Sequence, residues 1–190
     1  MGSSSVTAEG RPKAQGSNNG DMPTEPSKPV SPAIHPQVRI GHVHLKVADL
    51  ERALKFYRDV LGFEVTQRMD NSAAFMSAGG YHHHIGFNTW ESQGGKPPPR
   101  GSTGLYHIAI LYPTREQLAD AVRRLIASGI MIDGAADHGV SEAIYLRDPD
   151  GNGVELYWDR PENEWPRSPD GGVAMYSHPL DVEALVRGEP

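Results

Sequence analysis

The sequence predicts an α+β fold made of two consecutive βαβββ repeats, and three observations carry this prediction. Each half opens with an apolar, strand-like run, VRIGHVHLKV at 38–47 and GLYHIAILY at 104–112. An amphipathic helical segment follows each run, and three short strand-like segments follow each helix. Equivalent positions in the two halves lie about 65 residues apart, as His42 and His107 illustrate. Self-similarity of this kind indicates one supersecondary unit used twice.

The helix boundaries follow from capping residues. The first helix is expected to begin after Asp49 and to end at Gly62, and the second to begin after Thr114 and to end at Gly129. Turn residues separate the remaining segments. The expected strands span 63–69, 73–78 and 83–88 in the first half, and 131–136, 142–147 and 154–158 in the second.

Composition divides the chain into a tail, a domain and an arm. Residues 1–37 are dominated by Ser, Gly, Pro, Asn and Gln, so we expect a disordered tail. Residues 38–160 are expected to form the domain, with one repeat at 38–90, the second at 104–160 and a Gly- and Pro-rich loop over 92–103 between them. Residues 161–190 carry Trp165, Tyr176 and a short helical pattern at 181–186. We therefore expect this segment to be an arm that packs on the domain.

The overall composition excludes several classes of function. A formal net charge of −6 argues against a nucleic-acid partner or an anionic membrane surface. No apolar run approaches the roughly 20 residues that a membrane-spanning helix needs. The absence of cysteine excludes disulfides, Fe–S clusters and a thiol nucleophile. Without a charged-then-apolar leader pattern or an Asn-x-Ser/Thr sequon, we expect a cytoplasmic protein.

A candidate metal site follows from the repeat. His42 and His107 occupy equivalent positions in the two opening runs, and Glu155 lies between Val154 and Leu156 in an apolar strand. A carboxylate in such a strand is costly to bury unless it is paired or bound to a metal. Two imidazoles and one carboxylate are the ligand set of many non-haem Fe(II) sites. Taken singly, each histidine fits a structural role better than a ligand role, and it is the repeat register that favours the joint interpretation.

A calcium loop is the competing interpretation of one segment. Asp148, Asp150, Asn152, Gly153 and Asp159 nearly match the EF-hand spacing. EF-hand loops end in a bidentate Glu and stand between two helices, whereas this segment ends in Asp and joins two expected strands. We therefore expect a hairpin turn here.

Four segments resemble the vicinal-oxygen-chelate superfamily, which contains glyoxalase I, antibiotic-resistance proteins and extradiol ring-cleaving dioxygenases. They are IGHVHLKVADLERALKFYRDVLGFEV, YHHHIGFNTW, GLYHIAIL and AIYLRDPDGNGVELYWDRP. Within the superfamily, the chain is most similar to catechol-2,3-dioxygenase-like proteins. With EWPR and PLDVEALV in the arm, the resemblance covers about residues 39–187. It implies one module that holds a metal ion in a cleft between two curved sheets.

The resemblance also implies roles for individual residues. His42, His107 and Glu155 match the metal ligands, for Fe(II) or alternatively Mn(II). Tyr145 matches a tyrosine that hydrogen-bonds the metal-bound substrate, and His138 matches a histidine that lines the substrate pocket.

The acid-base histidine of the ring-cleaving members falls within the triple-histidine segment. It lands on His83 by the resemblance, whereas strand alternation from Gly86 favours His84 as the inward residue. Only a local bulge would reconcile the two.

The expected function is that of an Fe(II)-dependent extradiol dioxygenase acting on a catechol-like aromatic diol with O2. One alternative is another metal-dependent enzyme of the superfamily, such as an isomerase, lyase or thiol transferase. Gly86 stands where glyoxalase-type members carry a Glu ligand, which counts against that chemistry. A metal-free protein that binds a small molecule such as an antibiotic is the other alternative. Many ring-cleaving members carry two modules, whereas this chain holds one, and its exposed sheet edges suit a homodimer.

Overall fold

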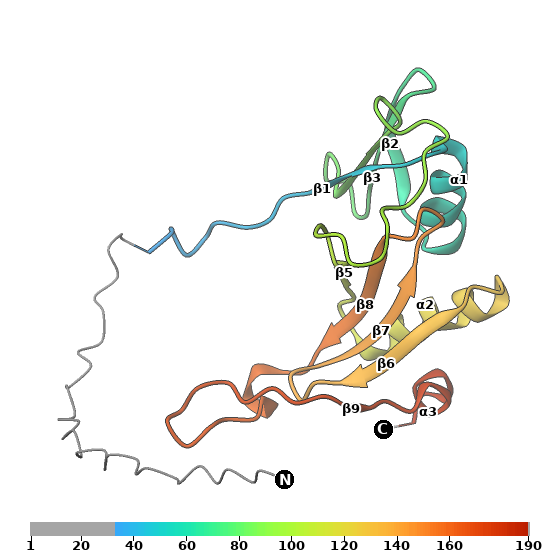
Figure 1. Ribbon diagram of the computed structural model, residues 1–190. Helices are drawn as coiled ribbons and strands as arrows, with labels where there is room; N and C mark the ends of the chain where they lie inside the picture. The colour runs from blue at the N-terminus through green and yellow to red at the C-terminus, as the bar shows by residue number, and fades with distance from the viewer. Residues whose placement is uncertain (1–32, 190) are drawn as a thin grey trace, which may run out of the picture. The chain divides into compact units, whose positions relative to one another are not determined.

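The computed structural model describes residues 33–189, in which the chain from Arg39 onward forms one compact unit (Figure 1). The predicted disordered tail at 1–37 lies outside the described residues, apart from 33–37. Two mixed sheets and a few short helices make up the compact unit. The predicted α+β class is therefore confirmed.

The first sheet has the strand order β1-β4-β3-β2, and the second has the order β5-β8-β7-β6-β9. The first contains β1 (Val43–Lys46), β2 (Glu64–Met69), β3 (Ala73–Ser77) and β4 (Ile85–Asn88). The second contains β5 (Ile108–Leu111), β6 (Ile132–Asp137), β7 (Ser141–Arg147), β8 (Gly153–Asp159) and β9 (His178–Pro179).

The two sheets repeat one topology. The opening strand of each half pairs in parallel with the last strand of that half, and the other pairs within each repeat are antiparallel. Val43 faces Ile85 in the first half and Ile108 faces Val154 in the second. The internal repeat read from the sequence is thus present in the strand pairing. The arm adds the edge strand β9 beside β6.

The opening strands are shorter than predicted. The run at 38–47 becomes a strand only from Val43, and the run at 104–112 only from Ile108. Residues 33–42 have no strand partner, and Ile40 is 92% exposed. His42 and His107 therefore lie immediately before these strands. Likewise β4 begins at Ile85, so the three histidines at 82–84 precede it.

The first two helices begin at the predicted caps, but the first one is α-helical only in its first part. α1 (Leu50–Leu54) begins where the Asp49 carboxylate accepts a hydrogen bond from the backbone N–H of Arg52, and it continues as the π-helix η1 (Lys55–Val60). The neighbours Phe56 and Tyr57 are both buried within this π turn. The remaining helices are α2 (Arg115–Ala127), the 3₁₀ turn η2 (Glu162–Glu164) and α3 (Val182–Arg187).

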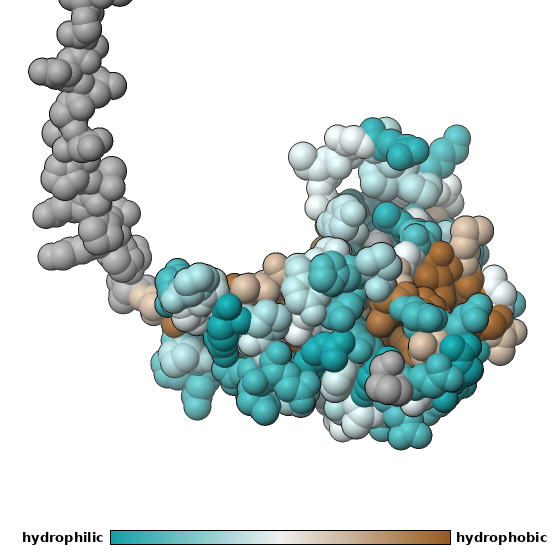
Figure 2. Space-filling model, turned by 90° about the horizontal axis from the view of Figure 1, so that it is seen from below, coloured by the Kyte–Doolittle hydropathy of each residue, from teal (hydrophilic) through white to brown (hydrophobic). Residues whose placement is uncertain are grey.

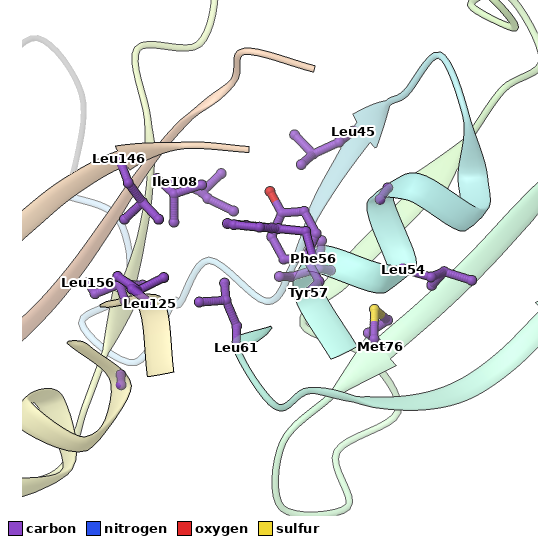
Figure 3. Packing of buried hydrophobic residues seen from close by; sticks show 14 of the residues in the cluster. Leu45, Leu54, Phe56, Tyr57, Leu61, Met76, Ile108, Leu125, Leu146 and Leu156 are labelled. Carbon is purple, nitrogen blue, oxygen red and sulfur yellow. The ribbon is translucent and has the colours of Figure 1, made fainter. Parts of the chain in front are cut away.

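One apolar core is shared by both halves. Figure 3 shows Leu45, Phe56, Tyr57 and Leu61 of the first half packed toward side chains of the second, and all belong to one buried cluster. The second-half members labelled in the figure are Ile108, Leu125, Leu146 and Leu156. Because side chains alternate along a strand, the residues between these positions point to the opposite, outer face of each sheet.

The turn between β7 and β8 fastens the second half to the first. The Tyr57 hydroxyl donates to Asp148 Oδ2 over 3.1 Å, and the Ala48 N–H donates to Asp150 Oδ1 over 2.9 Å. Asp148 Oδ1 also accepts hydrogen bonds from the backbone N–H groups of Asp150 and Asn152. These carboxylates thus organise a hairpin between antiparallel strands, as expected in place of a calcium loop.

The outer surface is mainly hydrophilic in the view of Figure 2, with apolar side chains gathered on the side on which Figure 1 draws the helices. No helix among residues 33–189 has the length and apolar character needed to span a bilayer.

Replacing Tyr57 by Phe tests the link between the halves. The substitution removes a buried hydrogen bond, so we expect the free energy of unfolding in urea to fall by about 1 kcal/mol at pH 8. Burial, followed by the charge of Asp148 and its hydrogen bond, raises the pKa of Tyr57 well above its ordinary value. In the unfolded chain Tyr57 releases its proton near pH 10, so the free energy of unfolding of the wild type falls as the pH rises past that value. The difference in free energy of unfolding between the wild type and Tyr57→Phe therefore narrows above pH 10. Tyr81→Phe, at an exposed tyrosine, is the control, and an equal loss there would contradict the prediction.

Candidate functional site

The outer face of the second sheet gathers four of the predicted site residues. Glu155 lies in β8 between the buried Val154 and Leu156, so its side chain points to the outer face. Across the sheet, Glu155 is paired with Ala109 on one side and with Tyr145 on the other. His107 precedes β5, and His138 follows β6 directly. Alternation along short apolar strands therefore brings this group together.

His107 and Glu155 form a close pair. The distance between His107 Nε2 and Glu155 Oε2 is 2.9 Å, and the side chains are 31% and 12% exposed, respectively. The other ring nitrogen of His107, Nδ1, is buried and has no hydrogen-bond partner among residues 33–189. Metal–ligand distances of about 2.1 Å place neighbouring ligand atoms roughly 3 Å apart in octahedral geometry. The pair therefore fits two adjacent positions around one divalent ion.

Tyr145 connects Glu155 to His138. The Tyr145 hydroxyl lies 3.2 Å from Glu155 Oε1 and 2.7 Å from His138 Nε2. Burial, followed by the charge and hydrogen bond of Glu155, raises the pKa of Tyr145 to about 12. The hydroxyl therefore carries its proton near neutral pH. With His138 neutral, this single proton can be donated either to Glu155 or to His138.

The C-terminal arm orients His138. Nδ1 of His138 lies 2.9 Å from the backbone carbonyl oxygen of Tyr176, which can only accept a hydrogen bond. Nδ1 therefore carries a proton, and in the neutral ring Nε2 is left free to accept from Tyr145. Ser177 lines the same cavity of about 390 Å³ as Tyr106, His107, His138 and Tyr145.

Sequence reasoning predicted that the arm packs on the domain, but it did not predict this contribution to the site. The available signal was the apolar pair Met175-Tyr176 in the arm.

The outer face of the first sheet holds a second group of histidines. The rings of His42 and His83 lie 4.3 Å apart between centroids, and the His83 ring also packs on Phe75. His84 turns instead toward Ser77, with 3.0 Å between its Nδ1 and the serine hydroxyl. The irregular segment before β4 thus places His83, rather than His84, beside His42.

The His44 ring covers Gly86. A Cβ atom on Gly86 would lie only 2.6 Å from His44 Nδ1. Any larger side chain at this position would therefore displace the imidazole.

The two groups do not form one complete site in this conformation. Within residues 33–189, no three His, Asp or Glu side chains converge closely enough to hold a metal ion. The residues thus fit a metal ion only in part, since His107 and Glu155 supply two ligands and His42 lies in the other group. A larger hollow of about 640 Å³ beside α1 contains none of the predicted site residues, so volume alone does not identify the site.

Residues 39–156 match the family described as the Glyoxalase/Bleomycin resistance protein/Dioxygenase superfamily. The chain is 43% identical over 155 residues to catechol-2,3-dioxygenase of Bacillus subtilis. This alignment covers 81% of this chain and 53% of the relative. It is 34% identical over 123 residues to biphenyl-2,3-diol 1,2-dioxygenase 3 of Rhodococcus globerulus, covering 64% of this chain and 63% of the relative. The chain thus spans about half to two thirds of the length of these relatives.

Among solved structures, the fold is similar to that of a lactoylglutathione lyase from Agrobacterium tumefaciens. The TM-score is 0.52 at 25% identity, over 65% of this chain and 96% of that one.

The contact between the arm and His138 can be tested at Gly139. A Cβ atom there would lie 2.5 Å from the Tyr176 ring and 2.8 Å from Pro166, so we expect Gly139→Ala to displace the arm. Gly129→Ala is the matched control, because Gly129 also has a positive φ but a Cβ atom added to it would meet no other atom within 4 Å. Limited trypsin digestion should cleave Gly139→Ala faster at Arg167, which is half exposed in the arm, while Gly129→Ala is cleaved like the wild type. Equal cleavage of both variants would contradict the contact.

Proposed function

Because this chain belongs to the glyoxalase/bleomycin resistance protein/dioxygenase superfamily, we propose that it is an extradiol dioxygenase that cleaves a catechol-like aromatic diol with O2, using Fe(II). The observation that carries the proposal is the His107–Glu155 pair, whose ligand atoms lie 2.9 Å apart beside the Tyr145 hydroxyl. The two dioxygenase relatives named above support the same reaction class. Mn(II), which accepts the same ligand types, is the alternative metal.

A divalent metal ion in such a site would hold the diol and O2 next to each other. The protein groups around it would then position the diol and carry its protons. The Tyr145 hydroxyl would hydrogen-bond a substrate oxygen beside Glu155. Its own proton has two alternative acceptors, Glu155 and His138. His83, beside His42, would act as the acid-base residue, since imidazole exchanges protons near neutral pH.

A lyase of the glyoxalase type is the second candidate, because the chain is similar to the lactoylglutathione lyase structure. The residues of the first sheet argue against it. Gly86 provides no carboxylate, and the His44 ring already fills the space above this residue. The dioxygenase therefore accounts for more of the described residues than the lyase does.

Oxygen consumption distinguishes the two candidates. Protein purified without oxygen would be loaded with Fe(II) and mixed with catechol and substituted catechols, while O2 uptake and the ring-opened product are measured together. The proposal expects one O2 consumed for each diol cleaved, and Glu155→Ala protein as the control should consume none. Turnover of a hemithioacetal without O2 uptake would instead support the lyase.

Comparing His83→Ala with His84→Ala tests the assignment of the acid-base residue. Because His83 lies beside His42 and His84 turns to Ser77, we expect turnover to fall roughly 100-fold or more in His83→Ala and much less in His84→Ala. Bound metal, measured by elemental analysis, should remain equal to that of the wild type in both variants. A larger loss of turnover in His84→Ala would transfer the role to that residue.

A further inference from the structure

A glycine lies on the floor of the candidate site. Gly134 in β6 lines the cavity of about 390 Å³ that also contains His107 and Tyr145. The cross-strand partner of Gly134 is Tyr145, whose partner on the other side is Glu155. Strands β8, β7 and β6 follow one another in the sheet (Figure 1). Neighbouring strands lie about 4.8 Å apart, so Gly134 lies one strand spacing beyond Tyr145 and two beyond Glu155.

The backbone does not require glycine at this position. Gly134 does not have a positive φ, so a residue with a side chain can adopt its conformation. The register of β6 against β7 shifts between Ile132 and Gly134, but such a bulge requires glycine only where φ is positive. A Cβ atom added to Gly134 would meet no other atom within 4 Å among residues 33–189. Neither backbone strain nor crowding therefore explains this glycine.

The internal repeat supplies an independent comparison. In the first sheet, the register of β2 against β3 shifts between Val65 and Gln67, which is the same irregularity at the equivalent place. Gln67 is paired there with Phe75, and its side chain is exposed. Gly134 occupies this position in the second half, where it is paired with Tyr145. A long side chain thus fits at this position of the repeat, and it is absent only in the half that lines the cavity.

Glycine in the interior of a strand weakens the fold. It provides no side chain to pack, and it gives the unfolded chain more conformational freedom than other residues do. A strand glycine often marks a place where a ligand approaches the backbone closely. Gly134 faces the cavity that contains His107 and Tyr145, so the ligand would approach from there. The space above Gly134 is therefore part of the site.

We propose that Gly134 determines substrate specificity by leaving room for a substituent on the catechol ring. The inference rests on the proposed function, which places a diol oxygen beside Glu155. From there the cavity continues over Tyr145 to β6. A ring that occupies it therefore places over Gly134 the edge opposite to its two hydroxyls. The substrate class is a catechol with a substituent at position 4 of the ring.

The charges at that end of the cavity favour an uncharged substituent. Asp133 and Arg147 both line the cavity, and Asp133 Oδ2 lies 3.0 Å from Arg147 Nε. The Arg147 guanidinium also donates to the carbonyl oxygen of Gly151 over 3.4 Å. Because the two side chains compensate each other, neither is left to bind a carboxylate or an amine on the substrate. An alkyl or aryl group can cover the bare strand at Gly134 and leave this ion pair intact.

Replacing Gly134 by Leu tests the proposal, because the added side chain fills the space while the backbone keeps its conformation. Catechol and 4-ethylcatechol would be compared as substrates of the Fe(II)-loaded wild type and variant, with O2 uptake as the measurement. We expect the KM for 4-ethylcatechol to rise about 10-fold or more, since a filled pocket discriminates against added carbon atoms by such factors. The kcat and KM for catechol should stay within about two-fold of the wild type.

The matched control is Gln67→Leu, which places leucine at the equivalent position of the half that does not line the cavity. Both KM values of this control should equal those of the wild type. Gly134→Ala adds only a Cβ atom, so its KM for 4-ethylcatechol should lie between those of the wild type and Gly134→Leu. The urea concentration at the midpoint of unfolding should be no lower in either Gly134 variant than in the wild type.

Binding measurements separate this proposal from the proposed reaction. Equal rises in both KM values, no change in either, or a lower urea midpoint in Gly134→Leu overturns the specificity role and leaves the dioxygenase standing. Isothermal titration without oxygen gives the affinities independently of turnover. Weaker binding of 4-ethylcatechol alone to Gly134→Leu, with a wild type that consumes no O2, supports the role of Gly134 and overturns the reaction. A folded wild type that binds neither diol overturns both.

Discussion

Burial of apolar side chains from both halves in a single cluster determines where every other group can point. Tyr57 lies fully buried in this cluster, with its ring against Phe56 and Phe87 and its hydroxyl bound to Asp148 of the second half. Because one face of each sheet is committed to the core, the alternate residues are placed on the outer faces. The positions of His107, Glu155 and Tyr145 thus follow from the packing of their apolar neighbours.

Glu142 and Glu155, which lie in adjacent strands, differ in the side chains that contact their carboxylates. Glu142 in β7 is buried between Arg115 and Arg160, which lie 2.7 and 2.8 Å from its two carboxylate oxygens. Its charge is compensated, and it ties α2 and the residue that follows β8 to β7. Glu155 in β8 contacts only an imidazole and a phenol. No guanidinium or ammonium group contacts it among residues 33–189, so its charge remains available to a cation.

Local sequence patterns predicted where the helices begin, because the hydrogen bonds that cap a helix join residues close together in the sequence. Asp49, Thr114 and Asp181 cap helices where their short side chains can accept a backbone hydrogen bond, and each does so in the structure. The π turn at Lys55–Val60 was not predicted from these patterns, and it holds Phe56 and Tyr57 in the core that both halves share.

The candidate site was predictable only in its parts. The repeat register identified His42 and His107 as equivalents, but equivalence does not determine which faces meet. The contact of His138 with the Tyr176 carbonyl joins residues 38 positions apart through backbone geometry, which residue identity does not encode. Likewise, the ambiguity between His83 and His84 depended on an irregular segment that strand alternation does not describe.

The shared core also has a consequence for synthesis on the ribosome. The first half emerges before Ile108, Leu125 and Leu156, which close the core over Phe56 and Tyr57. Until they arrive, the nascent first half exposes a broad apolar surface and leaves the Tyr57 hydroxyl without Asp148. Such a surface favours aggregation or capture by chaperones. Folding of the first half is therefore completed only after translation has passed β8, and a chain stopped in the 92–103 loop would not reach its folded form.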